Sequence, residues 1–121
     1  MKVKRIKIGI KDLKTVLDDF VKTGEAIERG EKVKKETGLY FTSFEAFRKA
    51  LTPKRLELLH IIKTNKPSSI NELAKMAKRD IKNVAEDVKY LEQVGLIEKK
   101  ETDKKTTAVI SYDRIALEIA V

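Results

Sequence analysis

Residues 69–112 constrain the fold most, because two amphipathic helices separated by three residues run straight into a hairpin. Ser69 and Glu72 have the spacing of a capping box at the start of the first predicted helix, INELAKMA. After the turn KRD, Asp80 starts the second, IKNVAEDVKYLEQ, and Gly95 ends it where a left-handed backbone is needed. The run LIEKKETDKKTTAVISY then holds two strand-like segments around a polar tip, which predicts a hairpin.

Another helix is predicted just upstream. Thr52 can cap it and Pro53 suits its first position. The following KRLELLHIIKTNK carries a broad apolar face, formed by Leu56, Leu58, Leu59, Ile61 and Ile62. Three helices and a hairpin in this order, with so short a turn between the last two helices, are typical of a helix-turn-helix.

The N-terminal part predicts a strand and a helix. Ile6, Ile8 and Ile10 have the alternation of a strand, and basic residues precede and separate them. Asp12 can then cap a helix that ends near Gly30. The polar, glycine-bounded stretch 30–38 reads as a linker. We therefore divide the chain into an N-terminal extension, 1–38, and a main domain, 39–121.

The main domain begins with a short strand candidate, LYF, at residues 39–41. Thr42 and Glu45 then have capping-box spacing before a short helix. The tail DRIALEIAV is apolar enough to pack but too short to assign. The predicted fold class is thus mainly α with a small β-hairpin wing (α+β), a winged helix-turn-helix with an N-terminal strand-helix extension.

The helix before Gly30 carries an apolar stripe at spacings of three and four residues. A two-fold symmetric pair of winged helices reads a pseudo-palindrome, so this stripe is the candidate interface of a homodimer. Alternatively, it covers the core of its own chain. An interface shared by residues 1–30 and the C-terminal IALEIAV would also suit a regulator of this size. The candidate interface residues of the stripe are Leu13, Val16, Leu17, Phe20 and Ile27.

The predicted helix 81–93 has the two faces that a helix in the DNA major groove requires. Ile81, Val84, Val88 and Leu91 form its apolar face. On the other face, Asn83 suits a paired contact to adenine, and Lys82 suits guanine or a phosphate. The candidate DNA-binding residues on and before this helix are Lys78, Arg79, Lys82, Asn83, Glu86, Lys89 and Tyr90. On the wing, which would follow the phosphate backbone or minor groove, they are Lys99, Lys100, Lys104 and Lys105.

Charge supports a polyanionic partner, nucleic acid before a membrane surface, since the formal net charge is +8. A lysine-rich and glutamate-rich solvated surface is the alternative. Residues 66–105 hold ten Lys and Arg against eight Asp and Glu, so the predicted DNA-binding part is nearly balanced. Residues 1–11 are basic without any acid, which fits either an arm on DNA or protection of an edge strand.

Little supports catalysis. The chain has no cysteine and one histidine, His60, which cannot build a common zinc site, so we expect neither metal nor cofactor. The five glycines form no phosphate-binding loop, and we expect no enzyme. No stretch approaches the ~20 apolar residues of a membrane span. The start MKVKRIKIGI lacks the apolar region of a signal peptide, so we expect a cytoplasmic protein.

Several stretches resemble a known family. FTSFEAF, LTPKRLELL, SINELAKMAKRD, KNVAEDVKYLEQVGLIE and SYDRI, within residues 39–115, are similar to MarR-like winged helix-turn-helix transcriptional regulators of archaea and bacteria. Some of those regulators are known as antitoxins beside a toxin gene. The resemblance implies that Lys82, Asn83 and Lys89 lie on the recognition helix, and 99–105 on the wing.

These features predict a sequence-specific regulator of transcription that binds double-stranded DNA as a homodimer. An antitoxin is a second hypothesis, in which the N-terminal stripe neutralises a toxin and DNA binding is autoregulatory. A third hypothesis is a winged helix used only for protein interaction. The near-balanced charge of residues 66–105 and the acids Glu86 and Asp87 support it.

Overall fold

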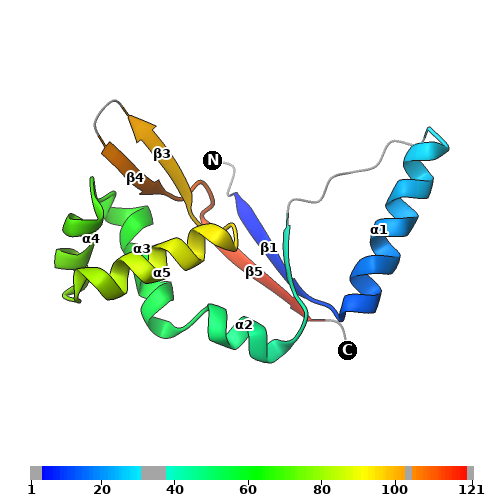
Figure 1. The fold of residues 1–121 in the computed structure, drawn as a ribbon, viewed down its shortest axis with the longest axis horizontal. Coiled ribbons are helices and arrows are strands. Elements are labelled where there is room, and N and C mark those ends of the chain that lie inside the picture. The colour runs from blue at the N-terminus through cyan, green and yellow to red at the C-terminus, as the bar shows by residue number, and fades with distance from the viewer. Residues whose placement is uncertain (1–3, 31–37, 103–104, 120–121) are drawn as a thin grey trace.

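The computed structural model describes residues 4–30, 38–102 and 105–119. In these residues the protein has a mixed α/β fold, with five helices, a three-stranded sheet and a two-stranded sheet (Figure 1). The helices are α1 (Leu13–Glu28), α2 (Phe44–Ala50), α3 (Pro53–Asn65), α4 (Ile70–Ala77) and α5 (Ile81–Gln93). The strands are β1 (Arg5–Ile10), β2 (Gly38–Phe41), β3 (Glu98–Thr102), β4 (Lys105–Val109) and β5 (Arg114–Ile119).

Helix α3 begins with the predicted cap, since Thr52 Oγ1 accepts a hydrogen bond from the Arg55 N–H at 3.2 Å. Helix α4 begins likewise, with Ser69 Oγ accepting from the Glu72 N–H at 3.1 Å. For α2 the predicted capping residue was wrong by one position, because Ser43 rather than Thr42 is the cap. These short-range bonds fix where each helix starts.

The three-stranded sheet has the order β2-β1-β5, with β1 parallel to both neighbours. Helix α1 is the crossover between the parallel strands β1 and β2. Strand β5 is the tail that the sequence pattern left unassigned. Thus β1, from the predicted extension 1–38, pairs with two strands from the predicted domain 39–121.

Helices α3 to α5 lie on one side of this sheet and share a core with it (Figure 1). Ile8 of β1 is fully buried, as are Leu58 of α3, Leu73 of α4 and Leu91 of α5. The sheet is therefore part of the same hydrophobic core as the helices that carry the predicted DNA-binding residues.

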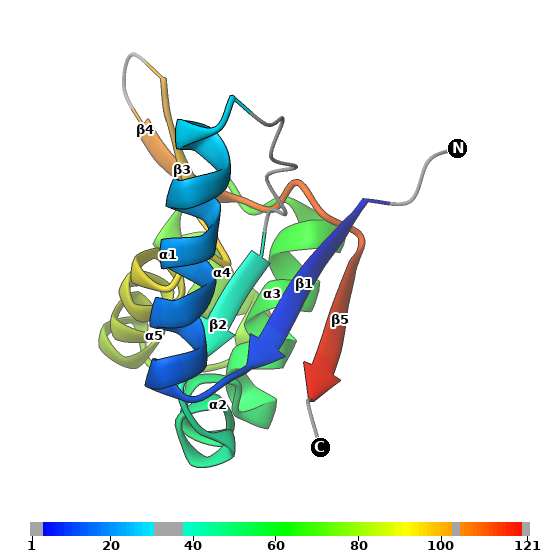
Figure 2. The same cartoon turned by 90° about the vertical axis from the view of Figure 1, so that its right-hand side faces the viewer.

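Helix α1 stands apart from the helical layer, on the other side of the sheet (Figures 1 and 2). Its cap follows the prediction, because the Asp12 carboxylate accepts from the Thr15 N–H at 2.7 Å. Phe20 is 77% exposed and Leu17 55%, so these members of the stripe do not cover the core. The side chains of the other candidates, Leu13, Val16 and Ile27, lie outside what the structure describes.

Strands β3 and β4 form the predicted antiparallel hairpin directly after α5. Gly95 lies between α5 and β3 and has a φ of 91°, the left-handed conformation expected at this position. Within the described residues, no helix is both long and apolar enough to cross a membrane.

Candidate nucleic-acid interface

The turn between α4 and α5 is compact because its backbone N–H groups bond to the last carbonyl oxygens of α4. Lys78 has a φ of 55°, and its N–H donates to carbonyl oxygens of α4, including Lys75 O at 3.2 Å. The Arg79 N–H donates to Ala74 O at 3.1 Å. Asp80 then begins α5 as predicted, although its side chain makes no capping hydrogen bond. This turn fixes the angle at which α5 leaves α4.

Helix α5 has the two expected faces. Val84, Val88 and Leu91 are buried in the core. Ile81 was predicted on this apolar face but is exposed, because on this helix the core begins one turn later, at Val84. Four of the predicted DNA-binding residues on this helix have exposed side chains, namely Lys82, Asn83, Glu86 and Lys89.

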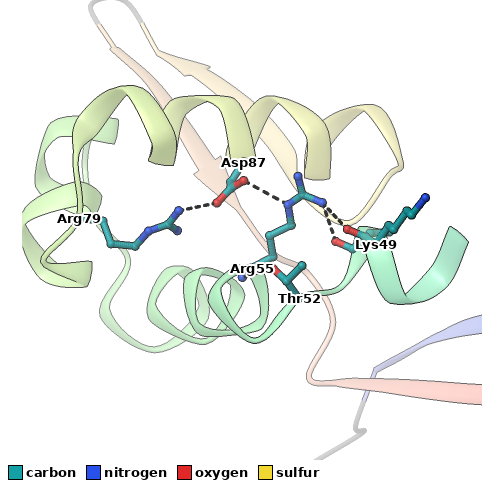
Figure 3. A network of polar contacts seen from close by, with 6 residues as sticks. Lys49, Thr52, Arg55, Arg79 and Asp87 are labelled. Carbon is teal, nitrogen blue, oxygen red and sulfur yellow. Dashed lines mark hydrogen bonds and ion pairs between the residues drawn. The ribbon is translucent and has the colours of Figure 1, made fainter. Parts of the chain in front are cut away.

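Asp87 lies between the two faces and binds two arginines (Figure 3). Its carboxylate accepts from Arg55 Nε at 3.2 Å and from an Arg79 guanidinium nitrogen at 2.9 Å. Arg55 also donates to the carbonyl oxygens of Lys49, at 2.8 Å, and of Ala50, at 3.1 Å. We call Arg55, Arg79 and Asp87 the arginine–aspartate cluster; it joins the end of α2, α3, the turn and α5.

Two of the predicted DNA-binding residues belong to this cluster or cover it. Arg79 directs its charge at Asp87 rather than into solvent, and one of its terminal nitrogens is buried without a hydrogen-bond partner in the structure. The Tyr90 ring lies 4.1 Å from the Arg55 guanidinium carbon and packs against it. In this arrangement both residues orient α5, whereas Lys82, Asn83 and Lys89 face solvent.

The hairpin adds basic residues beside α5. Lys99 is exposed and its ammonium lies 2.9 Å from the Glu92 carboxylate of α5, which ties the hairpin to the helix. Lys100 is exposed and makes no ion pair with another described residue. Of the predicted tip, Lys104 lies outside the described residues, as does the side chain of Lys105, whose backbone starts β4.

Lys78, Lys82, Asn83, Lys89 and Lys100 are therefore exposed to solvent. Exposed acids lie near them in the chain, namely Asp80, Glu86, Glu98 and Glu101. The lysines and Asn83 offer charged donors to phosphates and an amide to base edges. His60 is exposed on α3. In the described parts of the chain, no group of three or more His, Asp or Glu side chains is placed to hold a metal ion.

Arg55 is the residue that the sequence analysis missed at this site. It occupies the first turn of α3, where nothing in the local pattern distinguishes it from the neighbouring Lys54. Asp87 gave a usable signal, because it lies three residues after Val84 and four before Leu91, beside the buried stripe. A carboxylate at such a position needs a cationic partner when it is partly buried.

One family model matches the chain. It is described as HVO_A0114 and covers residues 50–117, which is more than half of the chain and runs from the end of α2 into β5. No curated protein and no solved structure matches the chain.

Proposed function

The chain belongs to the HVO_A0114 family, and we propose that it is a sequence-specific transcriptional regulator that binds DNA as a homodimer, through a winged helix-turn-helix of the MarR-like kind. The observation that carries the proposal is the surface of α5. Lys82, Asn83 and Lys89 are exposed there, opposite the residues that hold the helix on its core. No catalytic step is part of this proposal.

In this proposal some residues contact bases and others contact phosphates. Asn83 and Lys82 read base edges from the first turn of α5, which is the end of a recognition helix that enters the major groove. Lys78, Lys100 and the wing-tip lysines contact phosphates, which supplies salt-dependent affinity. The arginine–aspartate cluster holds α5 at the angle that this contact needs.

The test is binding to duplex DNA across a salt series, with random duplex and with duplex from upstream of its own gene. We expect Lys82→Ala/Asn83→Ala to remove the preference between the two duplexes. Lys104→Ala/Lys105→Ala is expected to flatten the salt slope for both, because fewer counterions are released. Lys14→Ala/Lys22→Ala is the matched control, since these exposed lysines lie on α1, away from α5. The proposal fails if neither duplex binds even at low salt.

An antitoxin is the second candidate function, and the exposed apolar side chains of α1 favour it. Leu17, Phe20 and Val21 are all exposed and offer a helix face to a toxin protein. Co-expression with the product of a neighbouring gene tests this: Phe20→Asp would abolish a stable complex and leave DNA binding intact. If no salt-dependent DNA binding is found, the third hypothesis is favoured, in which the winged helix binds only proteins.

A further inference from the structure

Strand β5 is an edge strand whose outer side has no strand partner in the described residues. The sheet order is β2-β1-β5, so β5 pairs with β1 on one side only. Figure 2 shows β5 at the margin of the molecule, with no other helix or strand beyond it. An open edge offers a row of N–H and C=O groups to another strand.

The register identifies which backbone groups face outward. The Arg114 N–H donates to Lys4 O, and Arg114 is the register partner of Arg5. Bonds of a parallel pair come from every second residue, so Arg114, Ala116 and Glu118 direct their backbone groups at β1. Ile115, Leu117 and Ile119 therefore direct theirs away from the sheet.

This edge carries neither lysine nor proline, and its two charged residues, Arg114 and Glu118, have opposite signs. Its outward-bonding residues are all apolar, and Leu117 is 42% exposed and Ile119 48%. Natural edges commonly carry lysine or proline, or are very short. The opposite edge, β2, has only four residues, whereas β5 has six.

The side chains of β5 are complementary to those of a second β5 running in the opposite direction. When Ala116 is opposite its own copy, Arg114 is opposite Glu118 and Ile115 is opposite Leu117. We propose that β5 pairs antiparallel with β5 of a second copy of this chain, about a two-fold axis at Ala116. The two sheets then become one sheet of six strands.

The charges on this face fit the pairing. Arg114 is exposed and makes no ion pair with another described residue. Glu118 uses Oε2 for Lys7, at 2.7 Å, while its side chain stays 65% exposed, so its other oxygen can accept from an arginine. Ala116, between them on the same face, leaves space for both long side chains. Symmetry makes the Arg114–Glu118 contact twice.

The opposite face fits as well. Ile115 and Leu117 would exchange backbone hydrogen bonds with Leu117 and Ile115 of the second copy, and their side chains lie on the core side of the sheet. Ile115 also lines an open hollow of about 200 Å³ with Leu56 of α3, which is exposed. Pairing of the edges would bring further apolar surface to this hollow.

This inference specifies the interface of the homodimer in the proposed function, and rests on that function for its need of two copies. The axis of an antiparallel pair is perpendicular to the sheet, so both helical layers lie on the same face of the joined sheet. Both copies of α5 are thereby on one side of the dimer, as reading of a pseudo-palindrome requires.

The experiment is sedimentation equilibrium of the full chain and four variants. Arg114→Glu and Glu118→Arg each place like charges opposite one another twice, so each should weaken the dimer at least about tenfold. The double variant Arg114→Glu/Glu118→Arg exchanges the charges and should restore the dimer. Arg48→Glu, an equal charge reversal at an exposed site on α2, should change nothing.

Rescue is the decisive outcome, because a merely structural effect of either substitution would not be repaired by the other. A monomeric wild type, a dimer that both single variants leave unchanged, or a double variant no better than the singles would overturn the inference. DNA binding is measured on the same samples. A rescued dimer without DNA binding refutes only the regulator, whereas salt-dependent DNA binding without this dimer refutes only the interface.

Discussion

Replacing Asp87 by alanine removes the only anion of the arginine–aspartate cluster in the described structure. The carboxylate pairs with Arg55 and Arg79, and the three side chains are 16%, 20% and 18% exposed. Removing one partner of a fully buried ion pair costs about 3–5 kcal/mol, because a charge is left uncompensated. Here water reaches each group in part, so we expect the free energy of unfolding of Asp87→Ala to fall by about 2–3 kcal/mol.

The assay is urea unfolding followed by circular dichroism, with Glu86→Ala as the control on the same helix. Glu86 is exposed and has no ion pair in the described residues, so its loss should stay within about 0.5 kcal/mol. Asp87→Asn should be intermediate, because the amide oxygen still accepts a hydrogen bond but carries no charge. In a double-mutant cycle, Asp87→Ala and Arg55→Ala should couple by more than about 0.5 kcal/mol.

The reasoning is refuted if Asp87→Ala unfolds within about 0.5 kcal/mol of the wild type, or if the cycle shows no coupling. The first result would mean that solvent screens the cluster as it screens a surface ion pair. The second would mean that Arg55 acts through its bonds to the end of α2 alone.

Four further outcomes follow from the fold. Burial raises the pKa of Tyr112 to about 12, so the contribution of Tyr112 to stability is complete below pH 10 and is lost as pH rises through about 12. Urea unfolding at rising pH should show this loss of stability. Tyr112→Phe should abolish the pH dependence. The same variant leaves the Leu96 carbonyl, which accepts from the Tyr112 hydroxyl at 2.8 Å, without that bond, and should lose about 1 kcal/mol at neutral pH. Thr52→Ala removes the cap of α3 and should lower the free energy of unfolding by about 1 kcal/mol, whereas Thr52→Ser should retain most of it. Gly95→Ala forces a φ of 91° on a residue with a Cβ and should lower the melting temperature, while Gly24→Ala, at a site without nearby atoms, should not.

The sequence predicted the helices and the hairpin well because their signals are local. Thr52, Ser69 and Gly95 each act within a few residues of themselves, and the apolar periodicity of α5 lies within one helix. The orientation of Arg79 and Tyr90 was not predictable in this way. Both turn toward Arg55 or Asp87, and the position of Arg55 depends on how α3 packs against α5.

The three-stranded sheet was not predicted, for a related reason. β5 has only three apolar residues in alternation, and its partner β1 lies more than a hundred residues earlier in the chain. A short strand carries no information about which distant strand it pairs with. For the same reason, the sequence did not show that Arg114 and Glu118 lie on an edge strand.

That sheet also imposes an order of assembly during synthesis on the ribosome. β1 is the central strand and is made early, yet Arg114–Ile119 is made after every helix of the described fold. Pairs of strands so far apart in sequence form slowly, because a long loop must close first. Until β5 has been synthesised, the side of β1 that pairs with β5 remains unpaired. A nascent chain stalled before residue 114 would therefore expose β1 to other chains, and premature termination there should yield aggregates rather than a smaller folded protein.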